Sequence, residues 1–169
     1  MNDEIEGITC KGQPVSRDYF PSDKEYVDFT IDCAELFSGD AIKAPFEGPF
    51  IVDITPAEGK FELTVRNGEN ATHVTLPARG WKQRFIDRAA NVEESSRIIR
   101  KGTPKEIGEH NFKRGKHHDE SARLLQKALK PEGIDISFET ARNLFDVMAQ
   151  LVKPVVVDKG PGPETLEKK

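Results

Sequence analysis

Residues 50–76 read FIVDITPAEGKFELTVRNGENATHVTL, and this stretch decides the fold class. Apolar and polar side chains alternate in three short runs, which is the period-2 pattern of strands with one buried face. Turn-forming residues separate the runs at 56–59 and at Asn67-Gly68. The stretch therefore predicts an antiparallel β-meander with one apolar face and one wet face, the wet face carrying Asp53 and Glu62.

Helical periodicity replaces the alternation after the meander, and helices are predicted over about 80–153. A first buried stripe consists of residues three, four or seven apart: Trp81, Phe85, Ala89, Val92 and Ile99. We interpret Trp81 and Phe85 as core side chains rather than platforms for stacked bases.

Capping residues place the later helix boundaries. Thr103-Pro104-Lys105-Glu106 has the marks of a helix start, and Gly115 predicts the end of that short helix. Another helix is predicted from about Asp119 to Lys130. Ser137 predicts the cap of a final helix with the strongest apolar stripe of the chain: Phe138, Ala141, Leu144, Phe145, Met148, Leu151 and Val152.

The N-terminal side of the meander is less regular. Residues 1–25 predict an irregular acidic arm, and the alternation of Val27, Phe29, Ile31 and Cys33 with polar residues predicts a strand, so that strands span about 26–76. The Gly-, Pro- and charge-rich residues 154–169 predict a disordered tail. The fold class is α+β: a single domain over 26–153, in which an N-terminal antiparallel meander packs against a C-terminal cluster of helices.

The composition is that of a globular protein. The chain has 169 residues, of which 36% are hydrophobic and 32% charged. Its two cysteines, Cys10 and Cys33, lack CxxC spacing and indicate a reducing compartment. Since the first residues are acidic and no stretch has the length of a membrane span, we expect a cytoplasmic protein without a membrane partner.

Charge is distributed unevenly along the chain. Residues 1–47 contain four Lys/Arg and eleven Asp/Glu, a net charge of −7, whereas residues 79–118 contain eleven Lys/Arg and five Asp/Glu, a net charge of +6. Such asymmetry predicts a macromolecular partner, a protein or an RNA, for the basic segment 79–118. It is equally consistent with the acidic half of the chain folding against the basic half.

His117, His118, Asp119 and Glu120 are the candidates for catalysis, because adjacent imidazoles and carboxylates can transfer protons near neutral pH. With His110, the two histidines are also candidates for a metal site. The spacing matches no known metal motif, and Asp119 and Glu120 also suit the first turn of a helix. Capping and solvation are therefore the default interpretation of the group.

A surface for phosphate groups is the other candidate site. Its predicted members are basic or polar: Lys113, Arg114, Lys116, Arg88, Arg97, His117 and Ser121. Ser121 lies close in sequence to a histidine, but no nucleophile elbow surrounds it. Neither GxGxxG nor GxxxxGK[ST] is present, and no cofactor is predicted.

Several motifs together resemble an uncharacterised bacterial protein family of the UPF class, over roughly residues 46–153. They are Gly48-Pro49-Phe50, Gly102-Thr103-Pro104-Lys105-Glu106-Ile107, Arg114-Gly115-Lys116-His117 with Glu120-Ser121, and Phe138-Glu139-Thr140-Ala141-Arg142-Asn143-Leu144-Phe145. Where the family pattern is similar to His-Asn-Glu-Gly-Ser, residues 117–121 are His-His-Asp-Glu-Ser. The resemblance implies a shared fold for the last two thirds of the chain and a function that is unknown.

Two functions remain as hypotheses. The first is a non-enzymatic accessory or regulatory protein that binds a macromolecular partner through its helical half. The second is a small enzyme or phosphate-ligand-binding protein that uses residues 117–120 together with Arg114 and Lys116. A concave pocket with convergent His and carboxylate groups would favour the second, and a convex basic face would favour the first.

Overall fold

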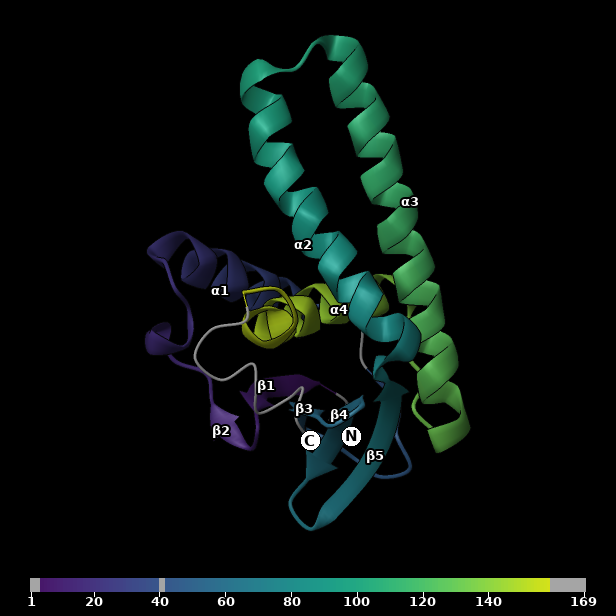
Figure 1. The fold of residues 1–169 in the computed structure, drawn as a ribbon. Helices are drawn as coiled ribbons and strands as arrows, with labels where there is room; N and C mark the ends of the chain where they lie inside the picture. The colour runs from purple at the N-terminus through teal and green to yellow at the C-terminus, as the bar shows by residue number, and fades with distance from the viewer. Residues whose placement is uncertain (1–3, 40–41, 159–169) are drawn as a thin grey trace.

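The computed structural model describes residues 4–39 and 42–158. A five-stranded sheet in the order β2-β1-β3-β4-β5 lies beneath four α-helices (Figure 1). This arrangement confirms the α+β class. The elements are β1 (Ile5–Cys10), β2 (Gln13–Pro14), α1 (Asp23–Phe37), β3 (Phe50–Ala57), β4 (Lys60–Asn67), β5 (Asn70–Pro77), α2 (Ala78–Lys101), α3 (Pro104–Leu129), α4 (Phe138–Lys153) and a π-helical segment, Pro154–Asp158.

The predicted meander is confirmed in β3, β4 and β5. Ala57 pairs with Lys60 and Asn67 pairs with Asn70, so both hairpins close over two residues. Gly59 and Gly68 have φ of 71° and 59°, a left-handed conformation that glycine adopts without a steric penalty. Turn chemistry that is local in sequence was therefore sufficient to set this register.

The irregular arm predicted for residues 1–25 is wrong at β1, which pairs in parallel with β3 and makes the sheet mixed. Asp53, predicted on the wet face, is buried because it binds the end of this added strand. Its carboxylate accepts hydrogen bonds from the Thr9 hydroxyl and, at 2.8 Å, from the Gly12 backbone N–H. A parallel partner more than forty residues away leaves no local signal in the sequence.

The strand predicted over residues 26–33 is also wrong, because this segment is part of α1. The side chain of Ser22 caps the helix by accepting a hydrogen bond from the Glu25 N–H at 3.2 Å. Phe29, Cys33 and Leu36 are buried at helical spacing, whereas Val27 and Ile31 of the apparent alternation are about half exposed. The four apolar residues of this short segment are compatible with the period of a strand and with the period of a helix.

The helix start predicted at Thr103 is confirmed by a reciprocal capping box with Glu106. The end predicted at Gly115 is wrong, since α3 continues through it to Leu129. An interior glycine weakens a helix by only about 1 kcal/mol, which the packing of the buried residues on either side can offset. Residue 99 is 74% exposed rather than buried, and its neighbour Ile98 is buried instead.

The final helix, α4, is confirmed with its Ser137 cap and its buried stripe, of which Phe138 is only partly buried. It contacts α1, α2, α3 and β3 and so lies at the centre of the molecule (Figure 1). The Phe145 ring stacks on Phe85, with centroids 5.4 Å apart, and lies 6.4 Å from the Trp81 ring. The helices on either side of α4 therefore pack around this aromatic cluster.

The predicted disordered tail is wrong for its first residues. Pro154–Asp158 continues α4 as a π-helical segment, and Val156 is buried in the core. The rest of that tail, residues 159–169, lies outside the described residues. Within the described part of the chain, each helix is too short or too polar to cross a lipid bilayer.

We predict that Phe145→Ala lowers the free energy of unfolding by about 3–5 kcal/mol, because a fully buried aromatic ring is replaced by a cavity. Phe112→Ala is the matched control, since Phe112 is 74% exposed and should change stability by less than about 0.5 kcal/mol. Urea denaturation measures both. Equal effects of the two substitutions would contradict the packing described for α4.

Candidate functional site

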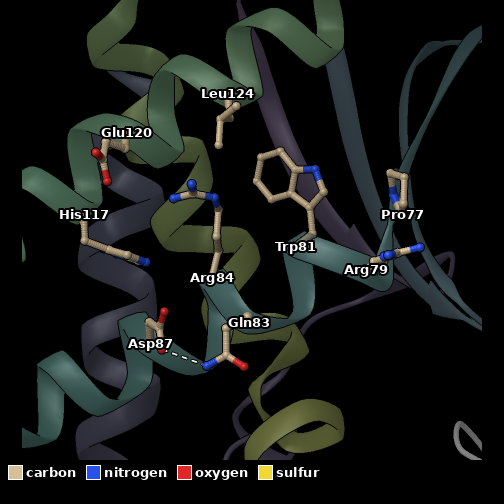
Figure 2. Close-up of a pocket in the computed structure, with 10 residues that line it drawn as sticks. Pro77, Arg79, Trp81, Gln83, Arg84, Asp87, His117, Glu120 and Leu124 are labelled. Atoms are coloured by element: carbon tan, nitrogen blue, oxygen red, sulfur yellow. Dashed lines mark hydrogen bonds between the residues drawn. The ribbon is translucent and has the colours of Figure 1, made fainter.

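A cavity of about 510 Å³ lies between the first turns of α2 and the middle of α3 (Figure 2). It contains two of the residues predicted from sequence, His117 and Glu120. The site is thus a concave pocket, and the imidazole of His117 and the carboxylate of Glu120 both line it. Its lining residues come from the end of β5, from α2 and from α3: Pro77, Arg79, Gly80, Trp81, Gln83, Arg84, Asp87, His117, Glu120 and Leu124.

A kink at the start of α2 shapes one side of the cavity. Arg79 and Gly80 have non-helical dihedral angles, and Gly80 has a φ of 97°, which an L side chain rarely adopts. Regular helix follows from Trp81, so that Trp81 and Arg84 lie one turn apart and both line the cavity (Figure 2). Trp81 also packs on Phe85, with ring centroids 6.0 Å apart, which fixes the indole in place.

Arg84 is one of two arginines that line the cavity, with Arg79, and the carboxylates of Asp87 and Glu120 also line it. The Nη1 of Arg84 donates a hydrogen bond to the Ser121 hydroxyl at 3.2 Å, and among the described residues no carboxylate lies within 4.0 Å of its guanidinium. The Nε2 of His117 is buried and has no hydrogen-bond partner in the described part of the chain. Burial and the neighbouring Arg84 lower the pKa of His117, which favours the neutral ring. An anion would supply the missing partner of Arg84.

The other two candidates for catalysis face away from this cavity. His118 contacts Asp146 of α4, and Asp119 forms an ion pair with Arg142 at 3.5 Å. Successive residues of a helix point about 100° apart, so residues 117 and 120 share a face that residues 118 and 119 do not. The structure thus separates the group that is contiguous in sequence.

A partly buried polar network joins all four helices beside His118. Arg88 lies between two carboxylates, with its Nε 3.2 Å from Asp146 Oδ1 and its Nη2 3.8 Å from Asp32 Oδ2. The Nε2 of His118 is 3.1 Å from the same Asp146 oxygen, and the Gln150 amide donates to Asp32. Asp32, Asp146 and Gln150 were missed from sequence. The one feature of the sequence that could have indicated these residues is the position of Asp146 and Gln150 beside the apolar stripe of α4.

The two carboxylates of the network have opposite pKa shifts. Burial and the charge of Asp146 raise the pKa of Asp32 to about 6, against the opposing effects of Arg88 and Gln150. Burial also acts to raise the pKa of Asp146, but hydrogen bonds and charge from His118 and Arg88 outweigh it and hold that pKa below its ordinary value. Asp146 is therefore the well-compensated carboxylate and Asp32 the poorly compensated one.

The predicted phosphate-binding residues do not form one surface. Lys113, Arg114 and Lys116 are exposed on the projecting half of α3. Arg97 forms an ion pair with Glu94 on α2. Arg88 and Ser121, the remaining members besides His117, are occupied in the network and in the contact with Arg84.

The three histidines considered for a metal site lie in three different environments. His110 is buried and shares a 2.6 Å hydrogen bond with Ser95, while His117 lines the cavity and His118 contacts Asp146. Over residues 4–39 and 42–158, no group of three or more His, Cys, Asp or Glu side chains is arranged to hold a metal ion.

Comparison with known proteins places the chain among sequences without an assigned role. The profile of the uncharacterised protein family UPF0262 matches residues 22–153. A UPF0262 protein of Rhizobium etli is 32% identical over 107 residues, which cover 62% of this chain and 67% of that protein. A second, from Novosphingobium aromaticivorans, is 29% identical over 117 residues, covering 66% and 71%. No solved structure matches the chain significantly.

We predict opposite effects of neutralising the two network carboxylates. The pKa of Asp32 is higher in the folded state than in the unfolded state. As the pH rises from about 4 to about 6, the unfolded state releases a proton that the folded state keeps, and the free energy of unfolding therefore falls. Asp32→Asn should therefore stabilise the protein near pH 7.5 by roughly 1–3 kcal/mol, a gain that vanishes near pH 4. Asp146→Asn should destabilise it near pH 7.5 by roughly 3 kcal/mol, because Arg88 loses its close partner.

Denaturant unfolding of both variants at a series of pH values measures these effects. Asp28→Asn on the same helix is the control, because its ion pair with Lys24 is exposed and should contribute less than about 1 kcal/mol at any pH. Destabilisation of both network variants near pH 7.5 would show that Asp32 is as well compensated as Asp146.

Proposed function

The chain belongs to UPF0262, a family of uncharacterised proteins, and we propose that it binds a small phosphate-bearing ligand in the cavity between α2 and α3. The observation that carries the proposal is the guanidinium of Arg84. It lines a cavity and has no carboxylate within 4.0 Å in the described part of the chain. A partly buried cation in this state gains most from a charge-assisted hydrogen bond with an anion.

The rest of the lining suits an ester of phosphate with an apolar or planar group. The unpartnered Nε2 of His117 can donate a hydrogen bond to a phosphate oxygen when the neutral ring carries its proton there. Trp81 and Leu124 provide apolar surface beside the two polar groups (Figure 2). Glu120 offers an acceptor for a ligand hydroxyl group.

We favour binding over catalysis. An acid–base mechanism needs a base whose orientation and proton are fixed by a second group. His118 and Asp119, which could have supplied that group, are engaged with Asp146 and Arg142 instead. His117 alone, with Glu120 on the same face, is sufficient for recognition.

Phenyl phosphate is the probe that tests this function. We expect Arg84→Gln to weaken its binding about 10- to 100-fold in isothermal titration calorimetry, the effect of one charge-assisted hydrogen bond. Arg97→Gln is the matched control, since Arg97 is exposed on the same helix and pairs with Glu94. Thermal melting of the Arg84 variant checks that the loss of its bond to Ser121 leaves the fold intact. Unchanged affinity in a folded Arg84→Gln protein would refute the proposal.

A macromolecular partner for the α2–α3 hairpin is the second candidate function. The hairpin extends beyond the rest of the molecule (Figure 1), and Ile99 and Phe112 on it are each 74% exposed. Large apolar side chains in water beside basic groups are typical of binding surfaces. The exposed basic groups of α3 here are Lys113, Arg114 and Lys116.

If that partner is RNA or another polyanion, retention on heparin should fall steeply with salt. Replacing Lys113, Arg114 and Lys116 by Ala should lower the salt concentration of elution and leave the unfolding free energy within about 1 kcal/mol. Absence of retention at low salt would leave an acidic protein surface as the partner to be sought. The phenyl phosphate experiment is independent of this result, because it depends on Arg84.

We also propose a cytoplasmic location. Cys10 and Cys33 are both buried free thiols, and burial raises the pKa of each. Protonated, buried thiols persist most readily in a reducing compartment.

A further inference from the structure

A second cavity, of about 680 Å³, lies between α1, α2 and the end of α4. It shares no residue with the cavity of Arg84. Much of its wall is apolar and comes from Ile31, Ile86, Ala89, Val92 and Val157. A cavity of this size with apolar walls and a few polar groups has the general form of a small-molecule site.

Three polar side chains of this cavity belong to the network of the four helices. Asp32, Arg88 and Gln150 all line it. Arg88 is closer to Asp146 than to Asp32, at 3.2 Å against 3.8 Å, so its charge serves mainly the carboxylate outside the cavity. Asp32 is left with the Gln150 hydrogen bond and a long ion pair, while only 24% of its side chain is exposed.

His118 faces Asp146 and Arg142 rather than Asp32. Its Nδ1 lies 3.3 Å from Nη2 of Arg142. Its Nε2 is 3.1 Å from Asp146 Oδ1, so the ring contacts the carboxylate that Arg88 already pairs with. Two carboxylates then share one guanidinium, and the network of Asp32, Asp146 and Arg88 has a net charge of −1.

The other charged groups around the cavity do not neutralise this excess. Glu25 pairs with Lys153 at 3.1 Å, and Asp28 pairs with Lys24 at 2.8 Å. Glu35, further along α1, acts on Asp32 as an additional negative charge. Glu93 of α2 lines the cavity, is exposed and forms no ion pair with a described residue, so it too favours a cation.

We propose that this cavity binds a small primary ammonium compound with an apolar body, whose ammonium group pairs with the Asp32 carboxylate. The ammonium supplies the one positive charge that the network lacks and can donate hydrogen bonds to Asp32. The apolar body covers the side chains of α1 and α2 that line the cavity, which include the half-exposed Ile31. The raised pKa of Asp32 is consistent with this site, because the burial and the Asp146 charge that favour a proton on Asp32 also favour a cation beside it.

Binding of 2-phenylethylammonium, followed by NMR chemical-shift titration of the full chain near pH 7.5, tests the proposal. The uncharged control is 2-phenylethanol, which has the same body. We expect the ammonium compound to bind at least about tenfold more tightly than the alcohol, and Asp32→Asn to abolish this preference. Asp28→Asn, one turn away and also lining the cavity, should keep it.

The pH dependence provides a second readout that a structural role of Asp32 would not produce. Below about pH 6 a proton competes with the ligand for Asp32, so affinity for the ammonium should fall by up to about tenfold per pH unit. In Asp32→Asn the affinity should not change with pH. Affinity for the alcohol should be flat in both proteins.

Three results would overturn the proposal: no binding of the ammonium compound at about 10 mM, equal affinity for ammonium and alcohol, or an unchanged preference in a folded Asp32→Asn protein. The proposal stands apart from phosphate binding. Asp32→Asn should bind phenyl phosphate as the wild type does, and Arg84→Gln should bind 2-phenylethylammonium as the wild type does. Failure of either function can therefore be recognised separately.

Discussion

The packing of α2 and α3 against one aromatic ring of α4 is the constraint on which the cavity of Arg84 and the contact between His118 and Asp146 depend. Phe145 stacks on Phe85 of α2 and also lies against two rings of α3, with centroid distances of 6.1 Å to His117 and 6.3 Å to His118. The ring thus lies near both of the adjacent histidines. His117 lines the cavity of Arg84 and His118 contacts Asp146, so moving α3 by a fraction of a turn would disrupt that cavity and the contact with Asp146.

The network at the junction of the helices is difficult to explain by stability alone. A buried ion pair is often no more stabilising than apolar residues of similar volume, and here two carboxylates share the guanidinium of Arg88. From the directions of their pKa shifts, we expect Asp32 to reduce stability near neutral pH and Asp146 to contribute to it. A group that costs stability, lies in a cavity and has a shifted pKa is typical of a binding residue. Its place between α1 and α4 also means that a ligand there would connect two helices far apart in the sequence.

The sequence predicted the parts of the fold that depend on neighbouring residues. The meander at 50–76 and the caps at Thr103 and Ser137 are set within a few positions by turn and capping chemistry, and all three are confirmed. The strand predicted at 26–33 failed because a short apolar alternation also fits a helix whose exposed side carries two apolar residues. Strand β1 was missed because its partner, β3, is remote in the sequence.

The candidate site was only partly predictable for a related reason. Residues 117–120 were considered as one group because they are contiguous, yet a helix distributes contiguous side chains around its axis. What joins His117 to its neighbours is Arg84, one helix away, and what joins His118 is Asp146 of α4. The positive charge of segment 79–118 divides in the same way. Arg84 and Arg88 face two cavities, whereas Lys113 and its basic neighbours face solvent. A net charge summed along the chain therefore counts basic residues that line cavities together with basic residues at the surface. Only the packing of the helices shows which residue belongs to which group.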